Sequence, residues 1–271
     1  MTRQDYIILL VSVSAMLVYF LLATPVMMDD GFHYEGFAEA LANGKLDFKS
    51  FYGFQGLSIL SVLIYWLTGS HISIIITSAI LFLLSLPLAY LIGKDFYSDK
   101  RAGLYFMVLI LLMPYVYTTM MRGFQEAALL FFILLIIYGS LNKKVWVPVV
   151  WAFGGIVKPF ALILFPLFAK DFLVRKHILW LGIAFLIGAT YLGLSYYQTG
   201  HLVNNAAIGS YQGNFDAGNP PPLWESFVPG VKGFLRIGAN LLSHPRKIII
   251  SPLIILLGAL ALFKSKELKL R

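Results

Sequence analysis

The sequence contains no cysteine and few charged residues. Of its 271 residues none is Cys, 13% are charged and 59% are hydrophobic. Without cysteine, a disulfide framework, thiolate catalysis and cysteine-ligated metals are excluded. The sequence also has no Gly-rich phosphate-binding motif, no Walker motif and no Ser–His–Asp pattern. A soluble domain is about half apolar and about a quarter charged, so this composition indicates an integral membrane protein.

The formal net charge is +8, from 21 Lys and Arg residues against 13 Asp and Glu residues. In a soluble protein such an excess would favour nucleic acid as a partner. In a membrane protein it instead indicates orientation, because basic residues gather in the cytoplasmic segments. We therefore expect membrane lipids around the chain and no nucleic-acid partner.

Eight apolar runs are candidates for membrane-crossing helices, although some are shorter than the roughly 20 apolar residues of a typical span. A signal peptide is the alternative for the first run, but the apolar core of a signal peptide has only about 7–15 residues. We therefore expect an uncleaved first span. The eight runs are 6–26, 71–92, 102–118, 124–141, 145–157, 160–168, 178–197 and 247–263.

Two further segments, between the first and second runs, are predicted to be helices that do not cross. Residues 31–43 place Phe37 and Leu41 on one face at helical spacing, and Gly44 is a plausible helix stop. Residues 55–68 are apolar, but they are short for a span and more typical of an interfacial or re-entrant segment.

The positive-inside rule fixes the expected topology. With the N-terminus in the cytoplasm and 55–68 not crossing, every short inside segment is basic, as the rule requires. If 55–68 crossed, the basic stretch 94–101 would fall outside and the pattern would degrade. We expect an all-α, polytopic protein of the plasma or inner membrane, one module over 1–271, with both termini cytoplasmic. Its long outer segments would be 27–70, with the juxtamembrane helices, and 198–245.

Asp29 and Asp30 lie where the first apolar run ends. One explanation is structural, since an aspartate at a helix start accepts hydrogen bonds from backbone N–H groups. The other is catalytic, since a carboxylate near a low-dielectric boundary can have a raised pKa suited to proton abstraction. The residues alone leave both explanations open, and Asp29 is the preferred base.

Lys158 lies between two short apolar runs and is followed by Pro159. Proline disfavours helix at the preceding residue, so the chain should turn at Lys158. Snorkelling to the membrane interface would explain a single lysine at such a turn. The functional alternative is a cation for a phosphate or pyrophosphate oxygen. We favour the functional role, because the helix pair is too short to need a flanking anchor.

Arg122 and Glu126 stand four residues apart at the start of an apolar run, so a helix there would place them on one face. A local ion pair is the structural explanation, and spacing alone favours it. In the alternative, Arg122 binds phosphate and Glu126 is a second active-site carboxylate.

Weaker candidates for contact with a substrate lie near the acids and in the long outer segments. Aromatic and amide side chains suit sugar stacking and hydroxyl recognition, although they are also ordinary in loops. A divalent metal site from both aspartates, His33 and Glu126 is chemically feasible, but no ligand spacing supports it. The weaker candidates are His33, Tyr34, Gln55 and His201.

Three motifs, in this order, resemble those of polytopic GT-C type glycosyltransferases. The resemblance is closest to the protein O-mannosyltransferase-like branch, which includes the lipid A aminoarabinose transferases. That family has an acidic pair after its first span, as in Asp29-Asp30-Gly-Phe-His-Tyr. It has an Arg and then an acid at the start of a later span, as in Arg122-Gly-Phe-Gln-Glu126. It also has a Gly-x-x-x-Lys-Pro segment followed by a Pro, as in Gly154-Gly-Ile-Val-Lys158-Pro159 and Pro166. The resemblance covers residues 1–175.

The resemblance implies transfer of a sugar from a polyprenyl-phosphate donor, with inversion at the anomeric carbon. The acceptor would be a hydroxyl of a lipid, glycan or protein at the outer face of the cell envelope. Asp29, the first of the two acids, would be the base. Lys158 and Arg122 would hold the donor phosphate, and Glu126 would help to position the acceptor or a metal. No nucleotide would be needed, and a divalent metal would be the candidate cofactor.

Two points stay open at this stage. Family members usually continue with further spans or a soluble domain, so a minimal enzyme, a fragment and one half of a complex are all compatible with this chain. A different class of function is a non-catalytic translocase of the lipid-linked sugar, or a partner subunit, which would not consume the donor. A transporter should carry polar or broken helices near the middle of the bilayer, and the sequence has few.

Overall fold

The computed structural model of the chain describes residues 29–51, 53–111, 120–169 and 175–200, with the isolated residues 6, 7, 10, 14, 27 and 202. The chain divides into two compact units, Met1–Asn214 and Phe215–Arg271, and the described residues all lie in the first. Every element in the described ranges is a helix, which confirms the predicted all-α class.

Some predictions fall on residues outside these ranges. They concern most of the run 6–26, the loop from 203 to 245, the run 247–263 and His201. These stay predictions.

Helices α4 (Ser73–Tyr97) and α5 (Lys100–Leu111) pack against each other as a hairpin. Their contact is close because Gly103 of α5 lies against the backbone of α4. A Cβ on Gly103 would lie 2.6 Å from the carbonyl oxygen of Tyr90. α4 continues beyond residue 92, where the apolar run ends, through Gly93, Lys94 and Asp95 to Tyr97.

The next elements continue this layer of helices. Helix α7 (Glu126–Leu141) packs on α4 and on α8 (Val147–Val157), and the 3-10 helix η1 (Pro159–Leu167) runs back beside α8. Between α8 and η1, Lys158 is extended, with φ −157° and ψ 129°. The turn predicted from Pro159 is therefore confirmed.

Length separates these helices into two groups. α8 has 11 residues and η1 has nine. They are therefore about 16 Å and about 18 Å long, less than the hydrocarbon core of about 30 Å. In the described part of the chain, two helices are long and apolar enough to cross a membrane, Ser73–Tyr97 and Ile178–Thr199.

These two candidate spans differ in their surroundings. Of the most apolar 18-residue window of α4, 56% is buried, against 17% for the window in α9 (Arg175–Thr199). A buried apolar helix is equally typical of a soluble core. An exposed apolar helix favours a lipid environment, because soluble proteins rarely expose large apolar patches. Large exposed side chains of α9 include Leu179, Phe185, Leu186 and Tyr197.

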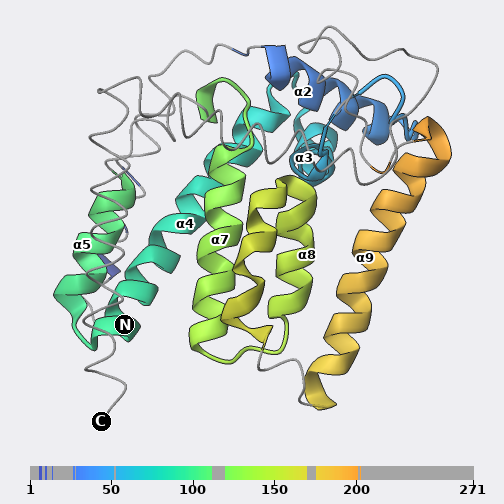
Figure 1. The fold of residues 1–271 in the computed structure, drawn as a ribbon. Coiled ribbons are helices and arrows are strands. Elements are labelled where there is room, and N and C mark those ends of the chain that lie inside the picture. The colour runs from blue at the N-terminus through green and yellow to red at the C-terminus, as the bar shows by residue number, and fades with distance from the viewer. Residues whose placement is uncertain are drawn as a thin grey trace, which may run out of the picture. The chain divides into compact units, whose positions relative to one another are not determined.

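Two shorter helices, α2 (Asp29–Ala42) and α3 (Gly56–Thr68), lie together at one end of this helical unit. Figure 1 shows α3 nearly end-on, whereas α4, α7, α8 and α9 run across the view. Short helices were predicted at both places. α2 begins at Asp29 instead of after the acidic pair, so both aspartates belong to its first turn. We call this end of the unit the α2 end.

Candidate functional site

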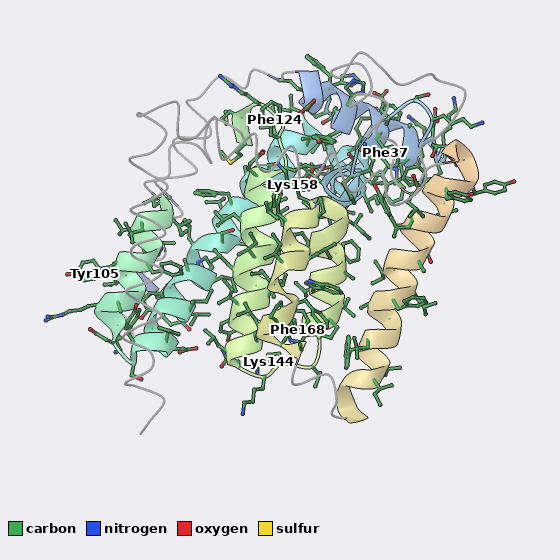
Figure 2. The ribbon with its side chains drawn as sticks, in the orientation of Figure 1. Phe37, Tyr105, Phe124, Lys144, Lys158 and Phe168 are labelled. Atoms are coloured by element: carbon green, nitrogen blue, oxygen red, sulfur yellow. The ribbon has the colours of Figure 1, made fainter. Side chains whose placement is uncertain are left out.

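Lys158 and Glu126 form an ion pair at the α2 end. Lys158 Nζ lies 2.7 Å from Glu126 Oε1, and the two side chains are 29% and 19% exposed. Lys158 occupies the turn between α8 and η1, and Glu126 is the first residue of α7. Figure 2 shows Lys158 at the same end as Phe37 of α2, and Lys144 at the opposite end.

The two oxygens of the Glu126 carboxylate have different surroundings. Oε1 accepts the hydrogen bond from Lys158, whereas Oε2 is buried and has no hydrogen-bond donor among the described residues. A buried polar atom without a partner is costly and therefore uncommon in folded proteins. The position of Glu126 at the start of α7 and its contact with Lys158 both favour negative charge there.

Aromatic and small residues hold the start of α7 against the turn after α8. Phe132 of α7 stacks on Phe153 of α8, with ring centroids 6.5 Å apart and planes within 9° of parallel. Gly154 allows this approach, because a Cβ there would lie 3.2 Å from Cβ of Phe132. Val157, fully buried, belongs to the same cluster as Ala128. This packing, next to the ion pair, fixes the start of α7 and the end of α8, the segments that position Glu126 and Lys158.

The first turn of α2, which carries Asp29 and Asp30, packs on the backbone around Arg122. A Cβ on Gly31 would collide with the carbonyl oxygen of Arg122, and a Cβ on Gly123 would lie 3.0 Å from Cα of Gly31. Asp30 is half-buried. The side chain of Asp29 lies outside the described set, so the structure places only its backbone. The acidic turn is thus beside the segment that leads into α7.

The sequence-based expectation for Arg122 and Glu126 is wrong in one respect. Gly123 has φ +79°, and α7 begins only at Glu126, so the two residues do not share a helical face. Among the described residues the ion-pair partner of Glu126 is Lys158, and Arg122 is exposed. The four-residue spacing implied a pair only if the helix extended back through Gly123.

Glu35 has a structural role that the sequence did not reveal. It is 4% exposed, and its carboxylate accepts hydrogen bonds from Ser73 Oγ at 2.7 Å and from the backbone N of Ile74 at 2.8 Å. These groups begin α4, whose own N-cap residue provides no side-chain cap. Glu35 therefore satisfies a free N–H at that helix end and ties α2 to α4.

Two glutamines fix the segment that leads from α2 into α3. Gln55 is fully buried: its backbone N donates to the hydroxyl of Tyr191, and its Oε1 accepts from Ser58 Oγ, both at 2.8 Å. Gln125, beside Glu126, donates from Nε2 to the carbonyl oxygen of Phe54. These contacts are internal to the protein, and a substrate contact for Gln55 stays a prediction.

The α2–α3 connection is also tied to the end of α9. The side-chain oxygen of Gln198 accepts from the backbone N of Phe48, and its Nε2 donates to the carbonyl oxygen of Leu46, both at 2.8 Å. Within the connection, hydrogen bonds from the side chain and backbone of Ser50 lower the pKa of Asp47. The connection is therefore an ordered part of the α2 end.

The remaining predicted residues are placed as follows. His33 is half-buried, with its ring edge-on to Phe51 at 6.4 Å between centroids. Tyr34 packs against the cluster that contains Val157, the residue before Lys158. Among the described side chains no group of three or more His, Asp or Glu residues could hold a metal ion.

Sequence reasoning missed Glu35, Gln125, Tyr191 and Gln198 as residues that position this end. All four act through contacts to other elements, 38, 71, 136 and 150–152 residues away. No local sequence pattern marks these contacts, because each joins residues that are far apart in the chain.

The described residues form an all-helical unit in which two apolar helices are long enough to cross a membrane. Three separate motifs meet at one end of it: the acidic first turn of α2, the Arg122 segment and the Lys158–Glu126 pair. No family model, curated protein or solved structure matches the chain.

Proposed function

We propose that the chain is a membrane glycosyltransferase that moves a sugar from a polyprenyl-phosphate donor to an acceptor hydroxyl. The observation that carries this proposal is the convergence at the α2 end. There Gly31, the residue after the acidic pair, packs on the backbone of Arg122, and Glu126 at the nearby start of α7 pairs with Lys158. A base and phosphate-binding cations are the groups that such a transfer needs.

In the proposed reaction Asp29 takes the proton of the acceptor hydroxyl. The acceptor oxygen attacks the anomeric carbon from the face opposite the phosphate, and its new bond replaces the bond from that carbon to the phosphate oxygen. The electron pair leaves with the phosphate, and the configuration at the anomeric carbon is inverted. Lys158 and Arg122 would stabilise the negative charge on the departing phosphate, with Asp30 and Glu126 beside them.

We further propose eight crossings, in which the short α8 and η1 cross as a pair packed on α7, with both termini in the cytoplasm and the α2 end outside. The distribution of basic residues supports this orientation. The first turn of α5, directly after α4, and the turn after α7 lie at the end opposite α2, and they carry exposed basic side chains. Cytoplasmic segments are enriched in such residues. These side chains are Lys100, Arg101, Lys143 and Lys144.

The test is Asp29→Asn in membranes supplied with a panel of polyprenyl-phosphate sugars and acceptors. We expect turnover to fall by at least about a hundredfold, because general base catalysis typically contributes that much or more. The control is Glu39→Gln, which changes an acid near the other end of α2 and should keep turnover. Insertion and thermal unfolding should be unchanged in both variants. Retained turnover in Asp29→Asn would remove that residue from its role.

A second outcome would change the class of function. If the wild-type chain binds the donor through Lys158 but consumes none of it with any acceptor, the glycosyltransferase proposal fails. The translocase or partner-subunit alternative would then account for the same phosphate site.

A further inference from the structure

The Lys158–Glu126 pair has an unusual feature for a phosphate site, because the cation is already paired with an anion. We propose that Glu126 makes the site selective for a phosphodiester that carries a neighbouring hydroxyl over a phosphomonoester. The inference rests on the proposed function, which places the donor phosphate at Lys158. It assigns Glu126 a role in specificity.

The first argument is charge. A phosphodiester carries one negative charge, whereas a phosphomonoester carries about −1.5 to −2 near pH 7. At an isolated lysine the second charge would strengthen binding. Here Glu126 Oε1 lies 2.7 Å from Lys158 Nζ, so the pair is close to neutral as a unit. A ligand that contacts Nζ lies within a few ångströms of the carboxylate, which cancels the advantage of the second charge.

The second argument is the free oxygen. Glu126 Oε2 is buried and has no donor among the described residues, so a ligand hydroxyl that displaces the atoms covering it would supply its missing hydrogen bond. A sugar joined to phosphate carries hydroxyl groups within a few bonds of it. A polyprenyl phosphate carries none. Both arguments therefore favour the sugar donor over the spent carrier, which the site would release.

Other charged groups at this end do not explain such a preference. Arg122 is exposed, so solvent and salt screen its attraction for the second charge of a monoester. Glu35 is occupied by Ser73 and by the backbone of Ile74. Asp30 is half-buried in the first turn of α2. The role of Asp29 is tested separately by Asp29→Asn.

Three probes with the same short prenyl tail separate the two arguments: the phosphomonoester, its methyl phosphodiester and its 2-hydroxyethyl phosphodiester. Binding is measured by calorimetry at pH 8 to the full chain in nanodiscs. For the wild type we expect the hydroxyethyl diester to bind several-fold tighter than the methyl diester. The monoester should gain nothing over the methyl diester from its second charge.

In Glu126→Gln the amide oxygen can still face Lys158, and the amide nitrogen then replaces Oε2. We expect affinity for the monoester to rise about tenfold relative to the methyl diester, since one unit of opposing charge is removed. The advantage of the hydroxyethyl group should disappear in Glu126→Met, which removes the acceptor without supplying a donor. The matched control, Glu39→Gln, should leave all three affinities unchanged.

The outcomes separate the two proposals. If no probe binds the wild type, or if Lys158→Met leaves the binding of every probe unchanged, the phosphate site of the proposed function fails. If binding depends on Lys158 but Glu126→Gln leaves the monoester-to-diester ratio unchanged, only the role of Glu126 fails.

A wild-type measurement covers the case in which Glu126→Gln does not fold. Between pH 8 and pH 5 the monoester loses its second charge, because its second pKa is about 6. With a neutral pair at the site, the monoester-to-methyl-diester ratio should stay flat over this range. A ratio that falls steeply towards pH 5 would overturn the proposal.

Discussion

Charged side chains are buried and paired at one end of the helical unit and exposed at the other. At the α2 end, Lys158 and Glu126 are largely buried and paired, and Glu35 is buried against the start of α4. At the other end, Lys143 and Lys144 are exposed in the turn after α7. The difference is one of cost. Buried charge persists only with a partner, whereas exposed charge needs none.

This contrast shows which charges are informative about a site. The exposed basic turns bear on orientation, which any of several lysines could provide. The α2 end depends on particular atoms, because glycines there press against backbone and acids bond to specific donors. Four experiments test this contrast, and the expected effect decreases from the first to the last.

The largest effect should come from labelling the two ends separately. Because the chain has no cysteine, Lys45→Cys and Lys144→Cys each introduce the single thiol. Both positions are exposed, one after α2 and one after α7. With a membrane-impermeant maleimide on intact cells, Lys45→Cys should label and Lys144→Cys should not. After lysis both should label. Equal labelling of intact cells would contradict the proposed orientation.

The next effect is on stability. In Lys158→Met the largely buried Glu126 loses its cation. We expect the free energy of unfolding to fall by about 2 kcal/mol. The loss is smaller than for a fully buried pair because both groups keep some exposure. Lys144→Met, at the exposed end, should change it by no more than about 0.5 kcal/mol. Denaturation in detergent measures both. Adding Glu126→Gln to Lys158→Met should recover part of the loss, and equal losses at the two ends would refute the contrast.

A smaller effect tests the close backbone contact of α2. Gly31→Ala forces a Cβ against the carbonyl of Arg122 and should destabilise the protein by about 1–2 kcal/mol. Gly188→Ala, in α9, meets nothing within 4 Å and should stabilise by about 0.5–1 kcal/mol, because alanine is the better helix former. If both changes act alike, the tight packing of the α2 end is not what distinguishes it.

The smallest effect is on pH dependence at the α2–α3 connection. The folded-state pKa of Asp47 lies below its ordinary value because Ser50 and Lys49 donate to its carboxylate. Its contribution to stability is therefore present above about pH 4 and is lost as the pH falls through the lowered pKa. The small difference in melting temperature between wild type and Asp47→Asn should shrink as the pH falls below about 4 and vanish at acid pH, below the lowered pKa. A difference that persists there would point to a cause other than the charge.

Local sequence signals predicted the features that depend on neighbouring residues. The helix after the first apolar run, the short segment 55–68 and the turn at Lys158 follow from periodicity, length and the proline rule, and all three are present. With eight alternating crossings the acidic pair, Arg122 and Lys158 are all expected on the outer side, and the structure brings their backbone segments to one end of the unit.

The features that sequence reasoning could not provide depend on tertiary contact. Glu126 pairs with a lysine 32 residues away instead of an arginine four residues away, because Gly123 breaks the helix between them. Glu35 caps a helix that begins 38 residues later. Neither partner is recorded in hydrophobic periodicity, which reports only which face of a helix is apolar.

At Gly31, Gly56 and Gly123 the α2 end has a wall, by which we mean backbone segments packed directly against each other without side chains between them. A Cβ at any of these positions would press on backbone atoms of a neighbouring segment. The outline of this wall is thus set by the path of the polypeptide and not by side-chain size. Directed evolution of ligand preference should therefore find few productive changes at these three positions, and should gather its gains at neighbours such as His33 and Tyr34.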